Sequence, residues 1–206
     1  MAATSVTRVL LLLSTAILFA VPSPAHAEES TEVSRPTTTG MKGAASDVAN
    51  FRRAVDKAST DAKKSADLFL QALAAYTLEK DLGLEMIAIL LPEDDRVKKN
   101  GVVVPSPFRQ NELEQLEDKP NVIRGYCGGT PEKAYQNADV AGCRATFDTS
   151  YSASRQGVNY PGKGKAKFYL ANGGSSRPRP IELEQDDDGR WLVSKYNLFA
   201  AVTDPT

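Results

Sequence analysis

Histidine is almost absent from this sequence, and its one occurrence, His26, lies in a segment that we expect to be removed. Residues 1–27 have the order of a secretory signal peptide: Arg8 supplies the charged start, residues 9–21 form an apolar run, and residues 25–27 form a small-residue cleavage site. The run is too short to span a bilayer comfortably. Without histidine, the mature chain lacks the most common general base and the most common metal ligand of proteins.

Cysteine is also scarce, because the chain has only Cys127 and Cys143. In an exported protein, an isolated pair of cysteines is more often a disulfide than two free thiols. A metal site needs more ligands than two thiolates, and a catalytic cysteine needs a histidine base. The sequence therefore predicts one disulfide, no metal and no cofactor.

An excess of positive charge is missing as well. The whole chain has a formal net charge of −1, which becomes −2 when Arg8 is lost with the signal peptide, and no region is basic enough for a nucleic-acid interface. No second apolar run reaches about 18 residues, so we expect no transmembrane segment after cleavage. These features predict an exported protein, periplasmic or extracellular, with an unidentified envelope or extracellular ligand and no nucleic-acid partner.

The hydrophobic pattern of the first half predicts helices. Residues 28–46 are polar and predict a disordered lead, after which one long helix is expected from Asp47 to Tyr76. A short buried helix is expected over residues 81–91, ended by Pro92, and a polar helix over residues 109–119, ended by Pro120. The apolar stripe of the long helix recurs every three or four positions, at Phe51, Val55, Ala58, Ala62, Ala66, Phe69, Leu73 and Tyr76.

The second half changes to a strand-like pattern. Between the helices, residues 92–101 predict a loop and residues 102–104 a short strand. Further strands are expected at residues 122–126, 144–151, 167–170, 179–185 and 190–196, the last two joined at Asp188-Gly189 by a turn with two positive φ values. Helices followed by an antiparallel sheet indicate an α+β fold, with residues 47–206 forming one domain of helices packed on a curved sheet.

Three segments of the C-terminal half resemble a family of secreted bacterial domains of unknown function. They are Tyr-Cys-Gly-Gly-Thr-Pro at residues 126–131, Ser-Arg-Pro-Arg-Pro-Ile at residues 176–181, and Gly-Arg-Trp at residues 189–191. The resemblance covers roughly residues 66–205 and implies a fold but no chemistry. The element order is also similar to the cone-shaped fold of nuclear transport factors and ketosteroid isomerases, by analogy of order and length only.

The leading candidates for ligand binding are Arg177 and Arg179, which alternate with prolines and could fork onto a carboxylate or phosphate. The alternative is surface charge paired to Glu182 or Glu184. Lys163, Lys165 and Lys167 alternate too, and are interpreted as the protection of an edge strand. The acidic turn from Glu184 resembles the start of a calcium loop, but its twelfth position is Lys195, which would repel calcium.

The leading prediction is a non-enzymatic binding or structural module of the cell envelope, with its site on the concave sheet face and at the two arginines. A second hypothesis is a cofactor-free isomerase or lyase in a cavity, in which Asp148 acts with Tyr126, Tyr151 or Tyr169. A third is a protective partner of an exported toxin, which would need a flat charged face.

Overall fold

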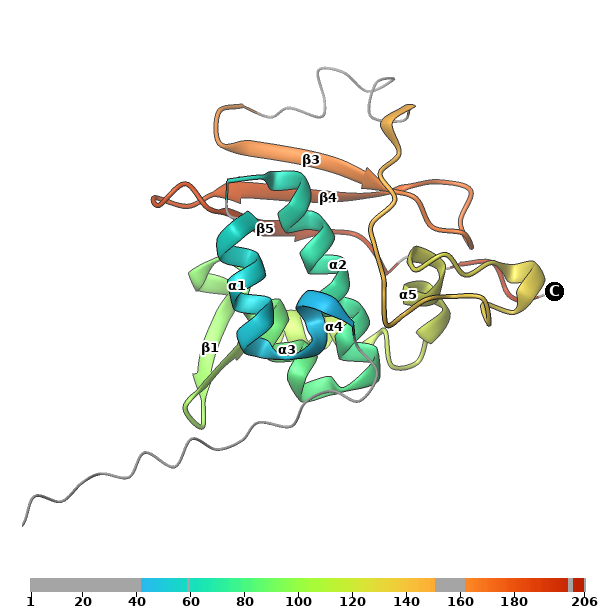
Figure 1. Ribbon diagram of the computed structural model, residues 1–206, viewed down its shortest axis with the longest axis horizontal. Helices are drawn as coiled ribbons and strands as arrows, with labels where there is room; N and C mark the ends of the chain where they lie inside the picture. The colour runs from blue at the N-terminus through green and yellow to red at the C-terminus, as the bar shows by residue number, and fades with distance from the viewer. Residues whose placement is uncertain (1–41, 59, 151–161, 200–201, 206) are drawn as a thin grey trace, which may run out of the picture. The chain divides into compact units, whose positions relative to one another are not determined.

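The computed structural model describes residues 42–58, 60–150, 162–199 and 202–205 (Figure 1). These residues all belong to one compact unit, Pro36–Thr206. The expected signal peptide, most of the expected lead and Tyr151 lie outside the described residues. The described part contains α-helices and two small antiparallel sheets, so the α+β prediction is confirmed.

The helical part begins earlier than the sequence indicated. Gly43–Ser46, the last residues of the expected lead, form a 3-10 helix (η1) in which Ala45 is fully buried. The single helix expected from Asp47 to Tyr76 is wrong: α1 (Val48–Ala58) and α2 (Ala62–Leu78) are separate. The cause is Asp61, which has extended backbone angles and accepts hydrogen bonds from the backbone N–H groups of Lys63 and Lys64, as an N-cap does.

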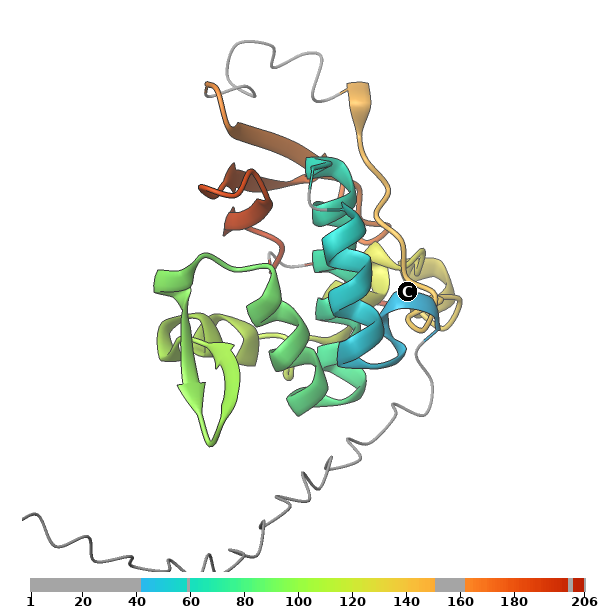
Figure 2. The same ribbon diagram turned by 60° about the vertical axis from the view of Figure 1, so that its left-hand side comes forward.

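After α3 (Lys80–Ile89) the chain forms a hairpin where a loop was expected. A short 3-10 helix, η2 (Glu93–Asp95), leads into β1 (Arg96–Lys99), which pairs with β2 (Val102–Pro105). The turn residues Asn100 and Gly101 have φ values of 50° and 83°, as a type I′ turn requires. Figure 2 shows this turn pointing away from the three-stranded sheet.

Two further helices follow, and the second replaces an expected strand. Ser106 caps α4 (Pro107–Glu114), which starts and ends earlier than residues 109–119. Pro120 does not end a helix, because α4 already ends at Glu114; it begins α5 (Pro120–Tyr126), so the strand expected at residues 122–126 is wrong. Proline suits the first helical turn because the N–H that it lacks would have no partner there.

The larger sheet contains β3 (Lys165–Leu170), β4 (Arg179–Gln185) and β5 (Trp191–Tyr196) in the order β3-β4-β5, so these strand predictions are confirmed. The strand expected from residue 144 is reduced, among the described residues, to one bridge between Phe147 and Leu170. In the β4–β5 turn, Gly189 has φ 78°, whereas Asp188 does not have a positive φ, which corrects the expected turn.

Helix α2 is the central element of this unit, because it contacts α1, α3, α5 and all three strands of the larger sheet (Figure 1). The sheet packs on it through side chains with no exposed surface, and the ring centroids of Phe69 and Tyr196 lie 4.9 Å apart. None of the described helices combines the length and the apolarity needed to cross a membrane. The fully buried residues of the sheet are Leu170, Ile181, Leu183 and Val193.

The predicted disulfide is confirmed, since Cys127 and Cys143 are bonded with their Cα atoms 4.8 Å apart. Cys127 is the C-cap of α5, so the bond ties the end of this helix to the end of the loop at residues 128–142. Asp67 of α2 holds the chain just beyond it, accepting hydrogen bonds from the backbone N–H of Ala145 and the guanidinium of Arg144.

Candidate functional site

Arg179 and Arg177 lie at the start of the central strand of the larger sheet, not on an edge strand. Arg179 is the first residue of β4, and Arg177 precedes it on an exposed segment. Pro180 is tolerated inside the sheet because it lies opposite Tyr169 at the end of the ladder, where its carbonyl accepts a hydrogen bond from the N–H of Asn197. The two prolines flanking Arg179 restrict the backbone on both sides of it.

Arg179 is half-buried, and its Nε is buried without a hydrogen-bond partner. Within the described ranges, neither Arg177 nor Arg179 forms an ion pair. The carboxylates proposed as their partners are held by lysines instead: Lys167 Nζ lies 2.7 Å from Glu182, and Lys165 Nζ lies 3.0 Å from Glu184. Cross-strand register explains this, since β3 places each of these lysines directly opposite its glutamate.

The charge of Arg179 acts on the side chain of Tyr126. Its hydroxyl is buried and donates a hydrogen bond of 3.2 Å to the carbonyl of Leu198. Burial raises the pKa of Tyr126 far above its ordinary value, while a hydrogen bond with Asn172 and, less strongly, the charge of Arg179 act in the opposite direction. Tyr126 is therefore a neutral hydrogen-bond donor at physiological pH.

The residues of the hypothetical enzyme site are brought together only in part. The backbone N–H of Asp148 donates to the carbonyl of Tyr169 at 2.9 Å, so Asp148 lies beside Tyr169 of β3. The Asp148 carboxylate accepts a hydrogen bond from the hydroxyl of Ser150, and Tyr169 is buried with Lys167 near its ring. Tyr126 belongs to α5 and is bonded to Leu198, and Tyr151 lies outside the described residues.

The acidic residues of the β4–β5 turn stabilise the hairpin itself. Asp186 accepts hydrogen bonds from the backbone N–H groups of Asp188 and Arg190, and its carboxylate lies 2.7 Å from the Arg190 guanidinium. In the register of β4 and β5, Lys195 faces Glu182. Over the described residues, no group of three or more histidine, cysteine or acidic side chains is arranged to hold a metal ion.

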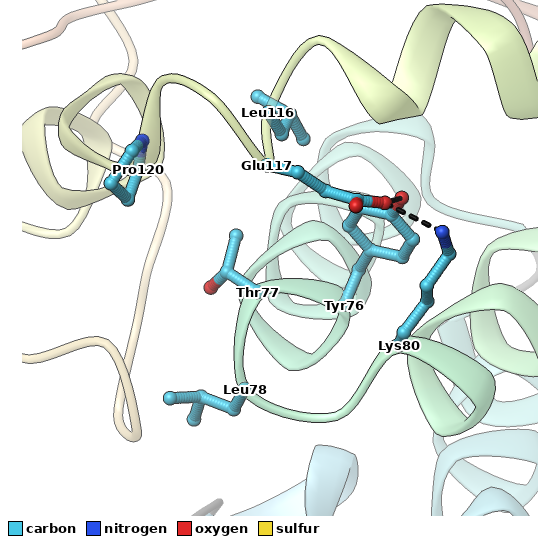
Figure 3. Close-up of a pocket in the computed structure, with 7 residues that line it drawn as sticks. All are labelled: Tyr76, Thr77, Leu78, Lys80, Leu116, Glu117 and Pro120. Atoms are coloured by element: carbon cyan, nitrogen blue, oxygen red, sulfur yellow. Dashed lines mark hydrogen bonds and ion pairs between the residues drawn. The ribbon is translucent and has the colours of Figure 1, made fainter.

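A cavity that the sequence did not indicate lies where α2 meets α3 (Figure 3). It has a volume of about 360 Å³, and its polar side is formed by Tyr76, Lys80 and Glu117. Sequence reasoning missed it because Tyr76 belongs to the apolar stripe of a core helix, and Glu117 belongs to a polar segment that is distant in sequence. The remaining lining residues are Thr77, Leu78, Leu116 and Pro120.

Glu117 is the centre of the polar side of this cavity. Its Oε1 accepts a 2.6 Å hydrogen bond from the Tyr76 hydroxyl and lies 2.7 Å from Lys80 Nζ. The hydrogen bonds from Lys80 and Tyr76 lower the pKa of Glu117, and the bond to Glu117 raises the pKa of Lys80. Burial and the bond to Glu117 raise the pKa of Tyr76, so carboxylate, ammonium and neutral phenol coexist at neutral pH.

A second cavity, of about 310 Å³, lies between η2 and the β4–β5 hairpin. Its lining includes Asp186 and Asp188, which already pair with Arg190 in the hairpin turn, and Arg96. Neither of these two cavities is lined by Asp148, Tyr126 or Tyr169.

Comparison with known families gives one match. A family model described as "Domain of unknown function (DUF6935)" matches residues 44–206, which agrees with the resemblance to a domain family of unknown function seen in the sequence. No curated protein and no solved structure matches the chain.

Proposed function

The chain belongs to this family, whose description names no activity, and we propose that it is an exported binding module that holds an anionic group at Arg179 and Arg177. Export rests on the signal-like residues 1–27. The disulfide between Cys127 and Cys143 supports it, because such bonds persist in oxidising compartments.

The observation that carries the binding site is Nε of Arg179, which is buried without a hydrogen-bond partner, in a side chain that forms no ion pair within the described ranges. A buried donor without a partner costs about 1–3 kcal/mol, and more when the group is charged. The sheet pairs its other half-buried cation, Lys167, with Glu182, so Arg179 stands out. An anion would supply the acceptor that Nε lacks once a small movement of the segment exposes this buried atom.

The chemistry of the guanidinium selects the ligand class. Its planar fork matches the two oxygens of a carboxylate or phosphate and forms bidentate hydrogen bonds with them. Arg177 adds a second positive charge two residues away, and Pro178 between them limits the backbone freedom that would be lost on binding. Carboxylate and phosphate groups are both abundant in anionic polymers outside the cell membrane.

Binding is favoured over catalysis because the neighbouring groups suit a passive role. The Tyr126 hydroxyl is committed to the Leu198 carbonyl, and burial keeps it protonated. A neutral phenol whose only proton is donated to a backbone carbonyl does not supply a base. Binding of an anion requires only the bidentate hydrogen bonds of the guanidinium and no acid or base.

The test is a calorimetric titration of the exported chain with two probes, inorganic phosphate and polyglutamate. We expect the double variant R177A/R179A to bind the better probe at least about tenfold more weakly, since charge-assisted hydrogen bonds contribute roughly 1.5–3 kcal/mol. R179K keeps the charge but loses the fork, so it should bind with intermediate affinity.

The matched control is K98A, because Lys98 is exposed and has no ion pair within the described ranges. K98A should bind as the parent does. Equal binding by parent and R177A/R179A, or no binding of either probe by the parent, would refute the arginine site. If R177A/R179A unfolds, the affinity of R179K is measured instead. An affinity equal to that of the parent would show that the guanidinium forms no bidentate contact with the anion.

A further inference from the structure

The cavity at the α2–α3 junction combines an apolar wall with one oriented carboxylate (Figure 3). Leu78 is half exposed at this site although it is a large apolar residue, and Leu116 and Pro120 line the cavity with it. Volumes of this size are at the lower end of the range for small-molecule sites. The cavity is therefore suited to a small ligand or to the end of a chain.

The carboxylate of Glu117 is fixed by one of its oxygens only. Oε1 accepts the bond from Tyr76 and contacts Lys80, whereas Oε2 has no hydrogen-bond or ion-pair partner within the described ranges. Because Tyr76 is almost fully buried in α2, its hydroxyl holds the carboxylate in place. A ligand that meets Oε2 thus finds an acceptor that is already oriented.

The charges around this cavity favour a cation. Glu117 lies 2.7 Å from Lys80 Nζ, and the charges of Glu114 and Asp81 also act on Lys80 and raise its pKa. Negative charge therefore exceeds positive charge among these groups, which favours a positively charged ligand beside the apolar wall.

We propose that this cavity binds a primary ammonium group carrying a short apolar chain, with the ammonium at Glu117 Oε2 and the chain against Leu78 and Leu116. Two sources share this chemistry: the free N-terminus of a peptide with an apolar first residue, and a small alkylamine. The proposal does not depend on the arginine site, which lies on other elements and takes the opposite charge.

The experiment is a calorimetric titration of the exported chain at neutral pH with three probes: pentylamine, leucyl-glycinamide and N-acetyl-leucinamide. The first two carry the ammonium, whereas the third keeps the apolar group without it. We expect both ammonium probes to bind and the acetylated probe to bind at least about tenfold more weakly, the loss expected for a charge-assisted hydrogen bond. Tighter binding of the dipeptide than of pentylamine would identify a peptide N-terminus, and the reverse order a free amine.

Variants of the two charged residues give opposite predictions. E117Q should weaken the binding of both ammonium probes at least about tenfold. K80M removes the competing cation but keeps an apolar stem, so it should strengthen binding. E132Q, at an exposed glutamate of the 3-10 helix Pro131–Lys133 (η3), is the matched control and should bind the probes as the parent does.

Three results would overturn the proposal. The first is loss of binding in K80M, which would make Lys80 the ligand-binding group. The second is binding of N-acetyl-leucinamide that is as tight as that of the amines, and the third is unchanged binding in E117Q.

The variant Y76F covers the case in which E117Q misfolds, because it retains the carboxylate and removes only the hydrogen bond that orients it. Y76F should bind more weakly than the parent and more tightly than E117Q, and an affinity equal to the parent's would contradict the oriented acceptor.

Discussion

Arg109 of α4 donates from Nη2 to Asp95 at 2.8 Å, and the same nitrogen donates to the carbonyl of Ser194 in β5 at 2.9 Å. Its Nη1 is bonded to Glu112, and its guanidinium lies 5.3 Å from the ring centre of Tyr196. One buried side chain thus ties α4, η2 and the outer edge of the larger sheet together.

Removing this side chain should be one of the most damaging single changes. We expect R109A to lower the free energy of unfolding by about 3–5 kcal/mol, because it leaves two carboxylates and a strand carbonyl without their partner. Urea denaturation measures the change. The surface variant K98A should stay within about 0.5 kcal/mol of the parent. A loss of that small size in R109A would show that the network is not stabilising.

Glu117 should make the stability of the fold depend on pH in the acid range. Its pKa is lowered in the folded state by Lys80 and Tyr76 from an ordinary value of 4.5, so its stabilising contribution is present above that pH. The contribution is lost as the pH falls through the lowered pKa. Melting temperatures of the parent and E117Q should therefore differ at neutral pH and converge in acid. The difference should shrink in a K80M background, and a difference independent of pH would contradict the assignment.

The disulfide should contribute about 3 kcal/mol, as expected for a loop that separates Cys127 from Cys143 by 16 positions. Reduction, or the double variant C127S/C143S, should lower the denaturation midpoint accordingly. Thiol titration of the oxidised, unfolded protein should find no free thiol. Two titratable thiols under these conditions would exclude the bond in solution.

Gly83 should be intolerant of any side chain, because a Cβ there would lie 2.2 Å from the Cα of Tyr76 and 2.3 Å from its backbone nitrogen. The two helices α2 and α3 cross closely at this point, and backbone atoms cannot move aside. We expect G83A to cost roughly 3 kcal/mol, the upper end for overpacking. The control G128A meets open space but has φ 86°, so it should cost only about 1–2 kcal/mol. Equal costs in the two variants would argue against a tight crossing.

Export should be visible in the mass of the mature protein. Cleavage after Ala27 predicts a chain that begins at Glu28, because the charged, apolar and small-residue regions follow in the order that signal peptidases require. Intact mass spectrometry of the protein from the medium or periplasm measures this. A mature chain that retains the apolar residues 9–21 would refute it.

The sequence by itself determined the features that depend on local pattern or on a scarce residue type. The strands of the larger sheet follow from alternation along each strand, and the hairpin follows from an Asp-Gly pair between two such strands. The disulfide follows because only two cysteines exist. The fold class follows from the order of helical and strand-like segments.

The tertiary structure alone decided which groups meet. The short segment at residues 122–126 is apolar enough for a buried strand or a buried helix, and the helix that begins at Pro120 fits the neighbouring α2. The strand register places Glu182 opposite Lys167, with which it forms an ion pair, so that Nε of Arg179 has no partner. The bond between Tyr76 and Glu117 joins residues 41 positions apart. Periodicity records which face of an element is buried, but it does not record which distant side chain that face will contact.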